Sequence, residues 1–199
     1  MSATSAIPPA SIESQWSLPY KGHVGMACLI AAESAIFTIF VVAYIYYIGK
    51  SLSGPTPRQV LDLPIFASIC LLSSSLTIHA AIGAIRKANV GAFRFWWFIT
   101  LVLGSIFLFE TGREWHRLIY EKGLTISSNL FGTTYYSLVG LHAFHVTVGL
   151  IGLLTILLLA LLGKVQQEHS TNIDVFAMYW HFVDVVWIVV FTVVYIIGR

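Results

Sequence analysis

The sequence has 199 residues, of which 57% are hydrophobic and only 10% are charged. A soluble domain of this length carries roughly a quarter charged residues, and the mean hydropathy of +0.82 indicates an integral membrane protein. The formal net charge of +2 gives no reason to expect nucleic acid or another acidic partner. One helical bundle is expected, without a second domain.

The first 23 residues differ in composition from the rest of the chain. They are polar, contain Pro and Ser, and lack the charged segment and short apolar run of a cleavable signal. We expect a tail over 1–23 and a single transmembrane domain over 24–199. The two cysteines, Cys28 and Cys70, each lie in an apolar stretch and are interpreted as small buried hydrophobic residues.

Five apolar spans follow the tail, each near or above the roughly 20 residues that a transmembrane helix needs. The predicted spans are about 24–48, 63–85, 95–112, 130–163 and 175–197, and the third continues as a charged helical turn over 113–122. Residues 50–59 (KSLSGPTPRQ) are predicted to be a Gly- and Pro-rich loop without helix. The predicted fold is an all-α membrane protein, a five-transmembrane-helix bundle.

The orientation in the membrane is not fixed by charge. Five basic residues lie on the side of the N-terminus and six on the other, so the positive-inside rule gives no clear answer. The compact basic loop 86–94 favours a cytoplasmic N-terminus.

Ionisable side chains lie inside the spans, where an unpaired charge costs several kcal/mol. Glu33 is central in its span, and we expect a neutral carboxylic acid that hydrogen-bonds to a neighbouring helix or a backbone carbonyl. A proton relay, or a contact to a lipid or partner, is the alternative. His79 lies near Thr77 and several serines and is expected to bridge helices, with haem ligation as the alternative.

Charged residues form a regular set at the end of the third span. Glu110, Arg113, Glu114 and Arg117 follow i, i+3, i+4, i+7 spacing and therefore share a helix face. We predict a salt-bridged stripe at the membrane edge rather than a catalytic group.

Two histidines of the fourth span, His142 and His145, are three residues apart and share a helix face. Helical histidines at this spacing can ligate one metal ion, but a site would need at least one or two further ligands from other helices. The spacing leaves both the metal site and a purely structural role open.

The last span contains His181 and Asp184, again three residues apart, and Asp184 shares a stripe with Trp180 and Trp187. The set is compatible with a metal or proton site, or with a His–Asp hydrogen bond that holds two helices together. We favour the second interpretation, a polar lock between helices.

The string YWHFVDVVW (179–187) closely resembles the final-helix signature of subunit III of the haem–copper terminal oxidases. The resemblance covers about 19–198 and places several of the polar residues on motif positions. Matching segments occur in the family's order: GMACLIAAESAIFTIFVVAY (25–44) with Glu33, LPIFASICLLSSSLTIHAAI (63–82) with Ser74, Ser75 and His79, LGSIFLFETGREW (103–115) with Glu114 and Trp115, and LTISSNLFGTTYYSLVGLHAFHVTVGLIGL (124–153) with His142 and His145.

Many members of that family have seven helices, whereas five are predicted here, as in five-helix bacterial forms. In the longer members the first two helices complete a V-shaped cleft that holds lipids. A full cleft within this chain is therefore not expected, although a helix of another subunit would supply the second wall.

The resemblance implies a subunit without haem or copper, with bound phospholipid, that packs on oxidase subunit I beside subunit II and a small subunit IV. It implies a bacterial cytoplasmic membrane location with the N-terminus cytoplasmic and the C-terminus on the outer side. It also implies support of proton uptake and of active-site stability during turnover, with His23 and His169 as a candidate proton-collecting surface. We favour cytochrome c over quinol as the electron donor.

Two other functions remain compatible with the residues alone. One is a haem-b membrane anchor of a respiratory dehydrogenase, with axial ligands drawn from His79, His142, His145 and His181. The other is a proton-coupled transporter that uses Glu33 and Asp184. Transporters usually contain inverted repeats and broken helices, and no Pro interrupts a span interior here.

Overall fold

The computed structural model describes residues 20–51 and 54–198, and within them every regular element is helical. The elements are α1 (Lys21–Tyr47), α2 (Pro57–Val60), α3 (Ile65–Arg86), α4 (Val90–Tyr120), α5 (Leu130–Leu161), the 3-10 turn η1 (Gln167–His169), α6 (Ser170–Phe191) and the π-helical segment η2 (Thr192–Ile197). Five of these helices, counting η1, α6 and η2 as one, are long and apolar enough to cross a membrane. The predicted all-α fold with five spans is confirmed.

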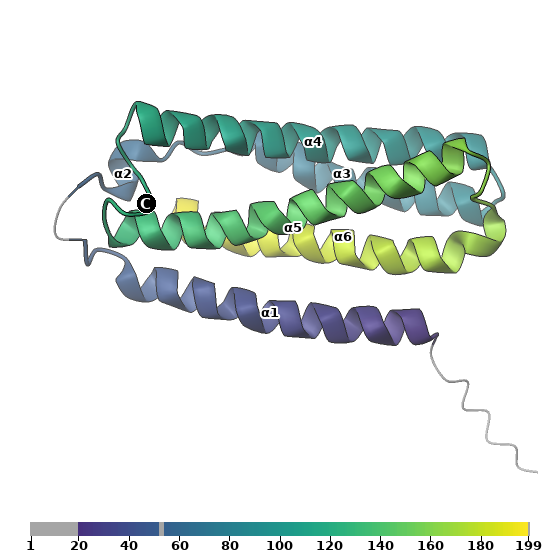
Figure 1. Cartoon of the computed structure of the whole chain (residues 1–199), viewed down its shortest axis with the longest axis horizontal. Helices are drawn as coiled ribbons and strands as arrows, with labels where there is room; N and C mark the ends of the chain where they lie inside the picture. Colours follow the sequence, from purple (N-terminus) through teal and green to yellow (C-terminus); the bar gives the residue numbers. More distant parts are fainter. Residues whose placement is uncertain (1–19, 52–53, 199) are drawn as a thin grey trace, which may run out of the picture.

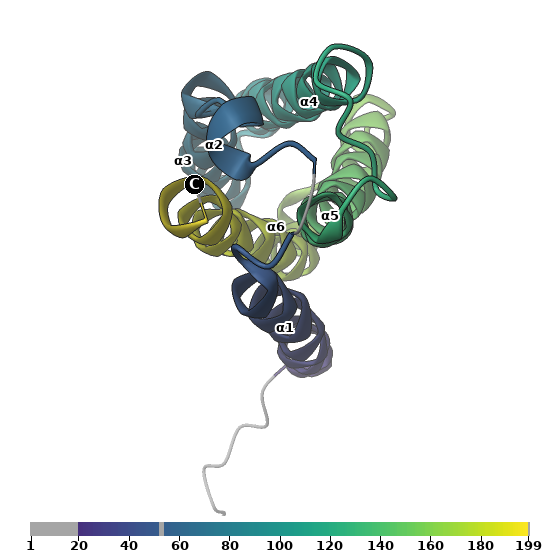
Figure 2. The same cartoon turned by 90° about the vertical axis from the view of Figure 1, so that its left-hand side faces the viewer.

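The long helices lie side by side along the longest axis of the molecule and alternate in direction (Figure 1). Seen from one end, α3, α4, α5 and α6 form a ring, and α1 lies outside this ring against α5 and α6 (Figure 2). The bundle is thus a group of four helices with a fifth helix attached to one side.

The centre of the four-helix group is filled by aromatic side chains. Trp97, Trp180 and Trp187 are almost completely buried. Two glycines leave room for Trp180, because a Cβ atom at Gly104 or Gly149 would approach its indole ring to 2.6–2.9 Å. Small residues that let large ones and neighbouring backbones approach closely are typical of helix packing in membranes.

Helix α1 is attached more loosely. Its only buried side chains in the described part are Phe37 and Tyr44, while most of its large apolar side chains are exposed. Cys28 is one of the exposed residues, so the predicted burial of both cysteines is wrong for Cys28 and holds only for Cys70. The reason is that α1 contacts its neighbours along one narrow face.

The helix bounds differ from the predicted spans at several places, and α6 begins at Ser170 rather than near residue 175. The loop over 50–59 was predicted without helix, but α2 begins at Pro57, where proline is compatible with the first helical position. Helix α4 begins at Val90 rather than near residue 95, because the Asn89 side chain accepts a hydrogen bond from the amide of Ala92 at 3.0 Å. Helix α1 begins at Lys21, so the last part of the predicted tail is helical, and 1–19 lie outside the described residues.

Candidate functional site

The polar residues of α3 and α6 meet halfway along the two helices. The hydroxyl of Ser75 donates a hydrogen bond to Oδ2 of Asp184. Oγ of Ser75 also lies 3.0 Å from Nδ1 of His181. A serine from α3 therefore bridges the two residues that were expected to bond directly to each other. Asp184 is 3% exposed, and its Oδ1 is buried without a hydrogen bond in the described residues.

Two tryptophans of α6 strengthen the same contact. The indole N–H of Trp180 donates to the hydroxyl of Ser74 at 2.8 Å, and that of Trp187 donates to Ser68 at 3.0 Å. Sequence reasoning found the α6 stripe but did not assign these serines as its partners. The signal was a similar spacing on two antiparallel helices, six residues between the serines on α3 and seven between the tryptophans on α6.

Glu33 connects the peripheral helix to the ring. Its Oε2 lies 3.1 Å from Nε2 of His145 on α5. The other ring nitrogen, Nδ1, lies 2.8 Å from the carbonyl oxygen of Leu141, which can only accept, so Nδ1 carries hydrogen. Nε2 then either accepts from a neutral Glu33 or donates to its carboxylate as imidazolium. In both forms the pair carries no net charge, which suits a site inside a membrane.

His142 is placed differently from His145 although both lie on α5. Its ring is completely buried, stacks on Trp187 with centroids 5.0 Å apart, and meets the edge of Phe107 at 5.7 Å. The two histidines thus turn to different neighbours. Within residues 20–51 and 54–198, no group of three or more His, Cys, Asp or Glu side chains is arranged to hold a metal ion.

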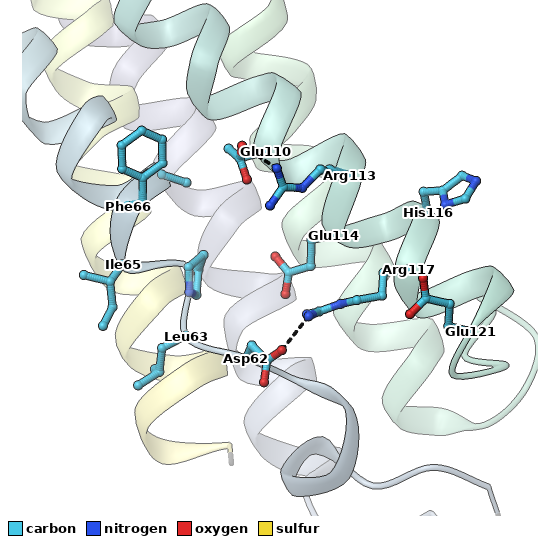
Figure 3. A pocket seen from close by; sticks show the side chains of 12 residues that line it. Asp62, Leu63, Ile65, Phe66, Glu110, Arg113, Glu114, His116, Arg117 and Glu121 are labelled. Carbon is cyan, nitrogen blue, oxygen red and sulfur yellow. Dashed lines mark hydrogen bonds and ion pairs between the residues drawn. The ribbon is translucent and has the colours of Figure 1, made fainter.

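The charged end of α4 lines an open cavity of about 440 Å³ (Figure 3). Glu110 and Arg113 pair at 3.2 Å, as their spacing predicts. The other two residues of the predicted stripe do not pair with each other. Arg117 binds Asp62 at 2.5 Å, and Glu114 accepts a hydrogen bond from the hydroxyl of Tyr195, 3.2 Å from its Oε2. Both partners come from segments distant in sequence, which helical spacing could not reveal.

At the opposite end of the bundle, ionisable side chains connect α1 and α3 to α6. Asp174 lies 3.0 Å from Arg86 and 3.8 Å from Nε2 of His23. His169 ends η1, and its Nδ1 accepts from the amide of Gln166 at 3.3 Å. His79 carries no hydrogen bond to a neighbouring helix in the described residues; instead it lines a cavity with Arg86, Asp174 and His181.

The comparison with protein families decides what kind of protein this is. The family described as cytochrome c oxidase subunit III matches residues 21–199, which is nearly the whole described chain. The chain belongs to the cytochrome c oxidase subunit III family.

Curated relatives agree with this assignment. A cytochrome c oxidase subunit 3 of Alkalihalophilus pseudofirmus is 34% identical over 177 residues, 88% of this chain and 86% of the relative. One from Synechocystis is 38% identical over 87% of this chain and 74% of the relative. The cytochrome bo(3) ubiquinol oxidase subunit 3 of Pseudomonas aeruginosa is 30% identical over 87% of this chain and 84% of the relative.

As a member of the subunit III family, the chain is an accessory subunit of a haem–copper oxidase and an integral membrane protein. Several of its intramembrane polar side chains contact one another at helix interfaces, among them Asp184 with Ser75 and Glu33 with His145. These contacts join α3 to α6 and α1 to α5.

Proposed function

We propose that this subunit III packs directly against subunit I of a proton-pumping haem–copper oxygen reductase and carries no redox centre of its own. The observation that supports this is the pairing of its polar groups: Asp184 with Ser75 and Glu33 with His145. His145 is engaged in this way and His181 contacts Ser75, so these two histidines are not free to serve as axial haem ligands. Subunit II and a small subunit IV would complete the complex, and the haems and copper would belong to the partners.

The exposed surface of α1 supports a role in assembly and lipid binding. Large apolar side chains cover its outer face: Val24, Leu29, Ile36, Ile39 and Val42. An apolar helix face of this kind packs against lipid or against a neighbouring transmembrane helix. We propose that phospholipid and partner subunits cover it.

We further propose that the end of the bundle bearing the start of α1 faces the cytoplasm of a bacterium. His23 and His169 lie at that end, and histidine changes its charge in the physiological pH range. They would collect protons for uptake by subunit I and so support activity during turnover. Relatives include both cytochrome c and ubiquinol oxidase subunits; we favour cytochrome c as the donor.

Purification of the tagged chain from native membranes in a mild detergent tests the assignment. We expect a large haem-containing oxidase subunit to copurify at equal stoichiometry. We also expect this chain, once dissociated from the complex, to show no Soret absorption. A Soret band on the separated chain would instead support the haem-b anchor, and a chain that purifies alone as a proton-coupled carrier would support the transporter.

A further inference from the structure

A continuous polar seam, made by one stripe on α3 and one on α6, runs from the end of the bundle into its middle. The α3 stripe contains Ser75, His79 and Arg86, and the α6 stripe contains Asp174, His181 and Asp184. Because the helices run antiparallel, Arg86 lies beside Asp174 at the edge and Ser75 beside Asp184 inside. Ten residues separate the two aspartates, or about 15 Å of helix, which is half of the roughly 30 Å hydrocarbon layer.

The outer half of this seam is hollow. A cavity of about 170 Å³ is lined by His79, Arg86, Asp174 and His181, and the guanidinium and carboxylate at its edge are partly exposed. A water molecule takes about 30 Å³ of liquid volume and is held by two to four polar partners. The volume of the cavity and its four polar side chains suit a short file of water, and the rest of its lining is Ile82, Gly83, Ala177 and Met178.

The inner half consists of direct contacts. His181 lines the cavity, its Nδ1 lies 3.0 Å from Oγ of Ser75, and the Ser75 hydroxyl donates to Asp184. A hydroxyl both donates and accepts, so it can relay a proton between two such partners. Asp184 makes no other hydrogen bond among the described residues, so the chain of contacts ends there.

We propose that this seam is a proton-conducting branch that lets Asp184, in the middle of the membrane, exchange its proton with water at the end where α1 begins. A proton that reaches His181 forms imidazolium. Its Nδ1–H bond breaks as a new O–H bond forms at Ser75, while the former Ser75 hydrogen moves to Oδ2 of Asp184. Imidazolium and carboxylate thereby become imidazole and carboxylic acid, and no net charge is created.

The positions of the ionisable side chains around the branch favour proton access to Asp184 from the end of the bundle where α1 begins. On α3 the ionisable neighbours are His79 and Arg86, on α6 they are His181 and Asp174, and on α1 His23 contacts Asp174. On α5, His145 is engaged with Glu33, and His142 stacks on Trp187 without a hydrogen bond to Asp184. Among the described residues, the ionisable groups that line the cavity or contact Asp174 thus lie between Asp184 and the end of the bundle where α1 begins. The branch rests on the proposed proton-uptake role only for its physiological purpose.

Infrared difference spectroscopy of the intact oxidase tests the branch. The carboxylic acid band of Asp184 is assigned by its loss in Asp184→Asn, and its shift is followed after transfer to D2O. We expect rapid exchange in the wild type and exchange slower by about tenfold or more in Ser75→Ala, because the hydroxyl relay is removed. Ser75→Thr keeps the hydroxyl and should restore fast exchange. No protonated Asp184 at any pH, no exchange, or exchange unaffected by Ser75→Ala would overturn the proposal.

A second variant acts on the assembled complex and so avoids a folding defect. Gly83 also lines the cavity, and a Cβ atom there meets nothing within 4 Å. In a Cys28→Ala background, a charged methanethiosulfonate reagent should modify Gly83→Cys and slow Asp184 exchange. Gly25→Cys on α1 is the matched control, since it also has open space but lies off the cavity, and its modification should leave exchange unchanged.

The experiments distinguish failure of the proton-conducting branch from failure of the proposed function of the subunit. Rapid exchange of Asp184 through Ser75, in an oxidase whose rate is the same with and without this chain, would uphold the branch and refute the proton-uptake role. Failure of both Gly83→Cys modification and wild-type exchange would refute the branch and leave the subunit assignment untouched.

Discussion

Helix α1 and the four-helix group α3–α6 are held by different means. The group is filled by large buried indole rings, and α6 is bonded to α3 through Trp180, Trp187 and Asp184. In the described residues helix α1 buries two side chains, and its polar contacts are Glu33 with His145 and, at the end of the bundle, His23 with Asp174. The four-helix group is therefore packed around buried side chains, whereas the outer face of α1 is largely exposed.

This difference matters for an accessory subunit. In a membrane, lipid is as apolar as the helix surface, so close packing and hydrogen bonds decide which helices stay together. A well-packed group can keep its shape when the subunit is separated, while a loosely attached helix adjusts to the complex. The predictions below test this contrast, beginning with the largest effect.

Replacement of Trp180 by Ala should destabilise the four-helix group most. The side chain is fully buried and packs on Gly104 and Gly149, and such large-to-small changes cost about 3–5 kcal/mol. The measurement is the temperature at which the subunit dissociates from the purified complex. Trp180→Phe keeps a ring but loses the bond to Ser74, so its effect should be smaller. Equal effects of the two variants would show that the packing of the indole is not decisive.

Asp184→Ala should weaken the contact of α6 with α3 by about 1–3 kcal/mol, because it leaves the Ser75 hydroxyl without its acceptor. The amount of this subunit retained in the complex should fall, while the haem content of the complex stays the same. Asp184→Asn, which still accepts from Ser75, is the matched control and should be retained better. Loss of haem or metal in stoichiometric amounts would contradict the lock and favour the haem-anchor alternative.

Glu33→Leu should loosen α1 by about 1 kcal/mol through loss of the bond to His145, and leave the four-helix group intact. Glu33→Gln retains a hydrogen-bonding group and should preserve assembly if Glu33 is neutral, as we expect. Thermal dissociation of the purified complex compares the two variants. Equal losses would mean that a charged carboxylate, rather than a hydrogen bond, holds α1.

Arg113→Ala should have the smallest effect. The side chain is 71% exposed and pairs with Glu110 within one helix, and exposed pairs of this kind contribute about 0.5 kcal/mol or less. The same dissociation assay, repeated at high salt, should show no difference from the wild type. A large effect would indicate that Arg113 contacts another subunit.

The sequence predicted the helices well because the length of an apolar stretch is enough to identify a membrane span. It predicted Glu110 with Arg113, whose contact lies within one helix. It could not predict that Ser75 joins His181 to Asp184, or that Tyr195 binds Glu114, because these contacts depend on how helices are rotated against each other. It also missed the exposure of Cys28, since an apolar pattern does not tell a central helix from a peripheral one.

Depletion of this chain from the purified oxidase tests the central claim most directly. The measurement is the rate of oxygen reduction against pH and time, together with the haem spectrum of the depleted enzyme. We predict an unchanged haem spectrum, initial activity that falls most at alkaline pH, where proton supply limits turnover, and activity that decays during turnover. A depleted oxidase that keeps its full rate at high pH without decay would contradict the proton-uptake role, and immediate loss of haem absorption would contradict a subunit without a redox centre.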